Sequence, residues 1–216
     1  MQDIRVWFEK RGRAKYISHL DLMRAMTRAV RRAELPLWYT EGFRPHPYLS
    51  FPLPLPLGQE GLREALDLRI EEIGYRMQEA GDRLGAVLPE GLRVLEVAQP
   101  WAKPGEIKAA EYEVVIPCDD PQAYAQNALR LLEEGNLTAK KMGKQGHRKV
   151  EKEIQLAPLI VKYALQPGEG EVHVACTLAA GSERNLNPAL LCEALGGMAA
   201  QIARTKLLRA DGAEWE

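Results

Sequence analysis

The spacing of apolar and polar residues predicts a strand at the start of the chain and a helix after it. Ile4, Val6 and Phe8 alternate with other side chains at the period of two that a half-buried strand shows. Ser18 is a suitable N-cap, and Pro36 ends the helix that follows. The apolar face of this helix consists of Leu22, Met26, Val30 and Ala33.

The rest of the first hundred residues continues this alternation of strands and helices. Extended segments at 37–40 and 48–53 flank the turn GFRPHP, and residues 66–70 and 92–98 read as strands. Between these two strands, a second helical stripe consists of Ile73, Met77, Ala80, Leu84 and Val87. The prolines of PLPLPLG lack the donor that a central strand needs, so residues 52–56 are expected to form an edge or an extended arm. The order strand, helix, strand pair, helix, strand is that of a split βαβ, or ferredoxin-like, unit.

The same order begins again after residues 99–106, which contain two prolines and a glycine and no periodicity. We expect a strand at 112–116, a helix between Asp120 and Gly135, and strand-like pieces at 137–165 around a basic loop, MGKQGHRK. A strand at 172–178, a helix from Pro188 with Met198 on its inner face, and a last strand at 202–208 complete the order. The sequence therefore predicts an α+β protein of two tandem ferredoxin-like halves, 1–98 and 107–216, joined by a linker at 99–106.

Composition excludes several classes of protein. The chain has 216 residues, of which 46% are hydrophobic and 27% charged, as in an ordinary globular protein. No secretory signal or uninterrupted apolar stretch of membrane-spanning length is visible, so we expect a cytoplasmic protein without membrane contact. The three cysteines are widely spaced, and neither a metal-ligand spacing nor a nucleotide-binding glycine motif occurs. No metal, cofactor or disulfide is therefore expected.

Positive charge is concentrated in two segments, although the formal net charge is only −1. Residues 1–54 contain ten Lys and Arg against five Asp and Glu, and residues 138–152 contain six against one. Each segment thus has a net charge of +5. Two solvated basic faces would account for this pattern, and so would binding to a polyanion.

Three groups of residues are candidates for binding RNA. The predicted first helix places Arg24, Arg28, Arg31 and Arg32 on one face, where like charges repel unless an anion neutralises them. The turn GFRPHP holds Arg44 and His46 beside prolines of fixed φ, either as a surface contact or as solvated residues of a strand crossing anchored by Phe43 and Tyr48. Basic side chains that could follow a phosphate chain come from the second segment: Lys140, Lys141, Lys144, Arg148 and Lys149. Aromatic residues gather near the first basic segment, a mixture that suits single-stranded nucleic acid: Trp7, Tyr16, Trp38, Tyr39, Phe43 and Tyr48.

One histidine could act in catalysis. His19 directly follows the predicted N-cap, where it could be a local structural residue or the general base of an RNA-cleaving site. No GxSxG motif supports a serine hydrolase.

Residues 16–58, YISHLDLMRAMTRAVRRAELPLWYTEGFRPHPYLSFPLPLPLG, resemble the start of the radical-SAM-linked protein family, a domain of unknown function. The pieces SHLDLMR, GFRPHPYLSF and PLPLPLG occur in the order and spacing of that family, and IARTKLL resembles its closing strand. The resemblance implies a cobalamin-binding radical-SAM protein as partner and a connection with RNA or translation. This chain lacks the CxxxCxxC motif of a [4Fe–4S] cluster, so the radical chemistry would belong to the partner. At the level of fold, tandem ferredoxin-like halves with a basic glycine-containing loop also resemble the CRISPR repeat-processing endoribonucleases.

Three functions follow as hypotheses. The first is an RNA-binding accessory module without catalysis of its own, which presents tRNA or rRNA to the radical-SAM partner. The second is a metal-independent endoribonuclease with His19 as general base. The third is a protein-binding adaptor that docks its partner through the proline-rich arm at 52–56.

Overall fold

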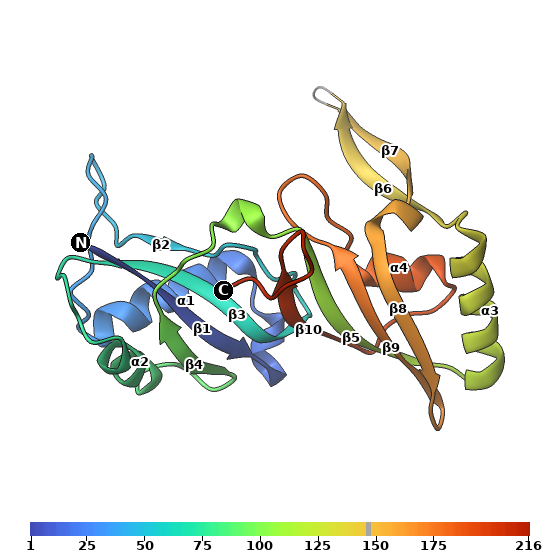
Figure 1. The fold of residues 1–216 in the computed structure, drawn as a ribbon, viewed down its shortest axis with the longest axis horizontal. Coiled ribbons are helices and arrows are strands. Elements are labelled where there is room, and N and C mark those ends of the chain that lie inside the picture. Colours follow the sequence, from blue (N-terminus) through green and yellow to red (C-terminus); the bar gives the residue numbers. More distant parts are fainter. Residues whose placement is uncertain (146–147) are drawn as a thin grey trace. The chain divides into compact units, whose positions relative to one another are not determined.

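The computed structural model describes residues 1–145 and 148–216, and within 141–152 it describes only the backbone of the two strands. The chain divides into two compact units (Figure 1). Unit 1 comprises Met1–Glu106 together with Trp215–Glu216, and unit 2 comprises Ile107–Glu214. Each unit is described by itself below.

Unit 1 is a ferredoxin-like unit. Its elements are β1 (Gln2–Lys10), the 3₁₀ helix η1 (Gly12–Tyr16), α1 (His19–Arg32), β2 (Leu49–Ser50), β3 (Glu60–Ile70), α2 (Met77–Gly85), β4 (Leu92–Ala98) and the 3₁₀ helix η2 (Pro104–Glu106). The strands lie in the order β4-β1-β3-β2, and every neighbouring pair is antiparallel. This is the strand order of a split βαβ unit, in which two helices cover one face of the sheet.

Local sequence explains how α1 begins and which face it buries. The hydroxyl of Ser18 accepts a hydrogen bond from the backbone N–H of Asp21 (3.2 Å) and donates one to the Asp21 carboxylate (2.7 Å). The buried side of α1 carries Leu22, Met26 and Val30, which pack in one core with the inward-facing residues of the sheet, Ile4, Val6, Phe8, Leu66, Leu68 and Ile70. The helix therefore fixes its arginines on the outer side.

Unit 2 repeats the arrangement with one insertion. Its elements are β5 (Ala109–Pro117), α3 (Pro121–Glu134), β6 (Thr138–Gln145), β7 (Arg148–Gln155), the 3₁₀ helix η3 (Ala157–Leu159), β8 (Ile160–Pro167), β9 (Glu171–Ala179), α4 (Pro188–Ala194) and β10 (Gln201–Leu208). The strands of the main sheet lie in the antiparallel order β10-β5-β9-β8, which is again the ferredoxin-like order. Strands β6 and β7 form a separate two-stranded ribbon between α3 and β8. The predicted α+β fold of two ferredoxin-like halves is thus confirmed.

Three local predictions are wrong. Helix α2 begins at Met77, not near Ile73, whose side chain is 85% exposed in a turn that includes Gly74 at φ 79°. Helix α4 ends at Ala194, and Met198 lies outside it, 82% exposed. The segment expected to be a basic loop is instead mostly paired strand, β6 and β7. The spacing of apolar residues does not show where a turn glycine ends a helix or where a strand finds a partner. These features set the boundaries of α2, α4 and the ribbon.

Within the ranges 1–145 and 148–216, no helix is both long enough and apolar enough to span a bilayer.

Candidate nucleic-acid interface

The arginines of α1 differ in what they contact. Arg24 pairs with Asp21 at 3.0 Å, and Arg32 donates to the carbonyl oxygen of Val87 at 2.9 Å. Within the described part of the chain, Arg28 and Arg31 form no ion pair, and both are exposed. A hydrogen bond from Ser18 and then one from Arg24 lower the pKa of the Asp21 carboxyl below its ordinary 3.8. The one acid of the first turn is thus already engaged, and the second half of the helix keeps its positive charge.

Three of the four arginines, all except Arg24, line a hollow at the C-terminal half of α1. The hollow has a volume of about 510 Å³ and is lined by Ala25, Arg28, Arg31, Arg32 and Pro89. Three of the five lining residues are arginines, and one of them, Arg32, already donates to Val87. A planar guanidinium can donate two hydrogen bonds to one phosphate, so the hollow suits a phosphate backbone.

Residues 38–48 form a hydrogen-bonded hairpin that extends away from the sheet of unit 1 and is drawn in light blue in Figure 1. The backbone N–H of Thr40 donates to His46 (2.9 Å), and that of Tyr48 donates to Trp38 (3.0 Å). The hydroxyl of Thr40 accepts from the backbone N–H of His46 (3.2 Å) and lies 3.1 Å from Nδ1 of the same residue. Both sides of the hairpin are therefore held, and its tip at residues 41–45 is presented to solvent.

The side chains at the tip are exposed. Phe43 is fully accessible to solvent (108% relative exposure), and Arg44 and His46 are exposed beside it. Gly42 adopts φ 128°, a conformation that side-chain-bearing residues avoid. The alternative in which Phe43 anchors a crossing of strands is therefore not met. Phe43 is instead an exposed ring next in sequence to an exposed arginine, a combination that occurs in proteins that bind single-stranded nucleic acid.

The guanidinium of Arg69 stiffens the base of this hairpin. It lies 4.8 Å from the ring centroid of Tyr48 and 5.4 Å from that of Trp38, and it forms two hydrogen bonds with Asp3. Tyr48 and Trp38 therefore serve the structure of the hairpin.

Two cations counted in the first basic segment are buried and do not add to the exposed positive surface. Arg5 and Lys10 are each 1% exposed. The ammonium of Lys10 lies 3.3 Å from the carbonyl oxygens of Lys15 and Ile17, so it holds η1 against the end of β1. Sequence reasoning missed the burial of Arg5, because the alternation of Ile4, Val6 and Phe8 predicts a strand with one buried face and places Arg5 on the other face.

His19 is the first residue of α1, as its sequence position predicts, and its ring packs edge-on against Phe51 at 5.3 Å. It is half-buried, which suits a local structural role. Among the residues with described positions, no cluster of three or more His, Cys, Asp and Glu could hold a metal ion.

The second basic segment lies on the ribbon of unit 2. In the register of this ribbon, Lys140 pairs with Glu153, Lys141 with Lys152, and Lys144 with Lys149. Apart from Lys140, the candidate side chains at Lys141, Lys144, Arg148 and Lys149 lie outside the described residues. The ribbon extends away from the main sheet of unit 2 (Figure 1).

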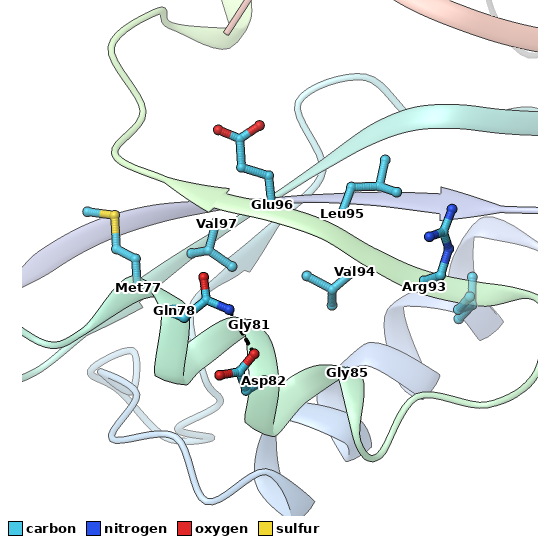
Figure 2. A pocket seen from close by; sticks show the side chains of 11 residues that line it. Met77, Gln78, Gly81, Asp82, Gly85, Arg93, Val94, Leu95, Glu96 and Val97 are labelled. Atoms are coloured by element: carbon cyan, nitrogen blue, oxygen red, sulfur yellow. Dashed lines mark hydrogen bonds between the residues drawn. The ribbon is translucent and has the colours of Figure 1, made fainter.

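A groove of about 340 Å³ between α2 and β4 differs from the hollow on α1 in its charge (Figure 2). Val94 and Val97 are directed toward the helix, while Leu95 and Glu96 lie on the other side of β4, as the bulge between Trp7 and Phe8 requires. Gly81 fits closely, because an added Cβ would lie 3.2 Å from Val97. The cation of the groove, Arg93, is paired with Glu9 at 2.7 Å, so nothing here favours a polyanion.

The fold places the chain in a class of α+β proteins built from two ferredoxin-like units. Residues 3–188 match the family described as "Uncharacterized protein conserved in bacteria (DUF2344)", and the chain belongs to this family. A search among curated protein sequences finds no match.

Among solved structures, a chain of the crystal structure of a Cbf5-Nop10-Gar1 complex is similar, with a TM-score of 0.51 and 9% sequence identity. The similarity covers 94% of this chain and 48% of that one, so this chain spans about half the length of its neighbour. At this identity the likeness shows the fold alone.

Proposed function

We propose that this chain is an RNA-binding accessory module of a radical-SAM protein and presents tRNA or rRNA for modification. The hairpin at 38–48 carries the proposal, because it holds a fully exposed Phe43 beside Arg44 and His46. Exposing a phenyl ring to water is unfavourable unless a partner covers it. Base stacking covers such a ring, and adjacent cations hold the phosphates.

The hollow on α1 supplies the second element of an RNA-binding surface. Arg28 and Arg31 are exposed and have no acidic partner among the described residues, which leaves their guanidinium groups ready for phosphate. Both features lie in unit 1, and all their residues except Pro89 fall within residues 16–58, the segment that resembles the radical-SAM-linked family. That resemblance supports the choice of partner.

Binding of a labelled single-stranded RNA to the Phe43→Ala variant tests the proposal. We expect a loss of about fivefold or more in affinity, the effect of removing one stacked base. Ile73→Ala is the matched control, since Ile73 is also a largely exposed apolar residue (85%) in a turn of unit 1. Equal affinity of the Phe43→Ala variant and wild type would contradict the proposal. The partner is tested separately, by copurification with a cobalamin-binding radical-SAM protein.

Incubation of the bound RNA in EDTA distinguishes binding from cleavage. A metal-independent nuclease uses the internal 2′-hydroxyl as nucleophile and leaves a 2′,3′-cyclic phosphate. We expect intact RNA, consistent with the packed position of His19 against Phe51. A cyclic product that disappears in the His19→Ala variant, while binding persists, would replace the accessory module by an endoribonuclease.

A further inference from the structure

The face of the unit 1 sheet that the helices do not cover contains a cavity that no sequence motif indicated. Its volume is about 300 Å³, at the lower end of the range for small-molecule sites. Residues from β1, β2, β3 and the linker line it, among them Arg5, Tyr48, Ser50, Asp67, Trp101 and Lys103. Its size suits a nucleoside better than a larger ligand.

Arg5 in this cavity has donors to spare. Its Nε donates to Asp67 Oδ1 at 2.7 Å, and its Nη2 donates to Asp67 Oδ2 at 2.9 Å and to the carbonyl oxygen of Ala102 at 3.1 Å. A guanidinium has five N–H groups, so these bonds leave both N–H groups of Nη1. Within the described residues Nη1 has no hydrogen-bond partner, although Arg5 is only 1% exposed. A buried donor without a partner is costly, and a ligand acceptor seated against Arg5 would satisfy it.

The charges around the cavity indicate which kind of acceptor fits. Arg5 is neutralised by Asp67, and Asp3 is neutralised by Arg69 at 2.6 Å. The inner part of the cavity is therefore close to neutral and favours a neutral carbonyl oxygen over a phosphate. The exposed Lys103 adds a positive charge at the rim, where a phosphate could remain in water.

Aromatic rings complete the site. The ring of Tyr48 is held from one side by the guanidinium of Arg69, and Trp101 is 59% exposed. Two rings, a neutral pocket with a spare donor and a cation at the rim together match the parts of one nucleotide.

We propose that this cavity binds a single base of the RNA strand, turned out of its stack, through a ring carbonyl oxygen that accepts from Nη1 of Arg5. Uracil, cytosine and guanine carry such an oxygen and adenine does not, so the cavity selects against adenine. The inference rests on the proposed function, since the RNA reaches the cavity along the hairpin that ends at Tyr48.

The test compares the affinities of U8 and A8 RNA oligonucleotides for the full chain. We expect U8 to bind about fivefold or more tighter than A8, and the Trp101→Ala variant to lose this preference while its affinity for A8 stays unchanged. Val161→Ala is the control, since Val161 in β8 is exposed to the same extent (59%) and lies outside unit 1. Equal affinity of the wild-type chain for U8 and A8, or an unchanged preference in Trp101→Ala, would overturn the inference.

Free nucleotides separate this inference from the proposed function. The indole N–H resonance of Trp101, assigned with Trp101→Phe, should shift with uridine 5′-monophosphate and remain in place with adenosine 5′-monophosphate. If both oligonucleotides fail to bind while the uridine response persists, the RNA-binding proposal fails and the cavity assignment stands. If RNA binds through Phe43 but neither nucleotide shifts the resonance, the cavity assignment fails alone.

Discussion

The two units share one strand order but treat the helix-free face of the sheet in opposite ways. In unit 1 this face buries Arg5 and Trp7, and Trp215 lies over the Arg5 guanidinium at 3.7 Å. In unit 2 the corresponding face leaves Glu113 and Ala175 exposed. The same strand order can therefore bury a charged side chain on this face or leave the residues of the face exposed to solvent.

The two units also differ in the charge of their surface hollows. The groove on the helix-free face of unit 2, about 360 Å³, includes Glu111 and Glu113, and the cation in its lining is Lys162. On unit 1 the hollow of α1 is lined by three arginines and no acid. The groove of unit 2 is therefore less suited to phosphate than the hollow of α1, and the RNA-binding features that we propose from described side chains lie mainly in unit 1.

The largest expected effect is on the stability of unit 1. Trp215 is fully buried (0%), stacks edge-on with Trp7 at 5.8 Å and donates to the carbonyl oxygen of Lys103 at 2.9 Å. Trp215→Ala should lower the free energy of unfolding by about 3–5 kcal/mol, because a large cavity replaces the indole. Urea denaturation followed by amide hydrogen exchange should locate the loss in β1, β3 and β4. Met198→Ala in unit 2 is the control, and equal losses of exchange protection in β5 and β9 would refute the assignment of Trp215 to unit 1.

A somewhat smaller loss is expected when the partner of Arg5 is removed. Asp67→Ala leaves the buried guanidinium of Arg5 without its counter-charge. Because the Asp67 side chain is only 16% exposed, little water can replace it, and the free energy of unfolding should fall by about 3 kcal/mol. Glu113→Ala changes a carboxylate on the exposed face of unit 2 and should leave the thermal midpoint within about 2 °C of wild type. Similar midpoints for the two variants would show that the buried pair has no special importance.

Charge reversal should separate the units in RNA binding. Changing Arg28 and Arg31 to Glu should weaken binding to all sequences alike and reduce the salt dependence. The log–log slope should become less steep by about 0.7 for each phosphate that the protein no longer neutralises. Lys140→Glu, the one candidate with a described side chain on the ribbon, should change the slope by no more than one such step. A larger effect from Lys140→Glu would move the main interface to unit 2.

The smallest effect on stability is expected at the hairpin tip. The free energies of unfolding of Phe43→Ala and of the double variant Arg44→Ala, His46→Ala should stay within about 0.5 kcal/mol of wild type, because all three side chains are exposed. The same variants should lose RNA binding, as measured by fluorescence anisotropy. Intact binding in the double variant would remove Arg44 and His46 from the interface, and clear destabilisation by Phe43→Ala would show that the ring packs inside the protein.

Much of the fold could be predicted because its signals are local. The alternation of Ile4, Val6 and Phe8, the cap at Ser18 and the Asp120–Pro121 start of α3 each act within a few residues, and the structure shows them as expected. The boundaries of α2 and α4 escaped prediction because Ile73 and Met198 continue the apolar spacing into turns. The spacing of apolar residues alone does not show whether the residue at the end of a helix packs against the core or lies in solvent.

The candidate site divides along the same line. The sequence by itself placed Arg24, Arg28, Arg31 and Arg32 on one side of α1, because helical geometry and the buried stripe leave them no other side. Only the tertiary structure decided that Arg5 is buried and Phe43 is exposed. Whether a residue is buried depends on which distant residues pack over it. Trp215 packs over the guanidinium of Arg5 and donates a hydrogen bond to Lys103, which is 112 positions away in the sequence. Phe43 lies at the tip of a hairpin whose two sides are joined by hydrogen bonds between Trp38 and Tyr48 and between Thr40 and His46, and its ring is fully exposed.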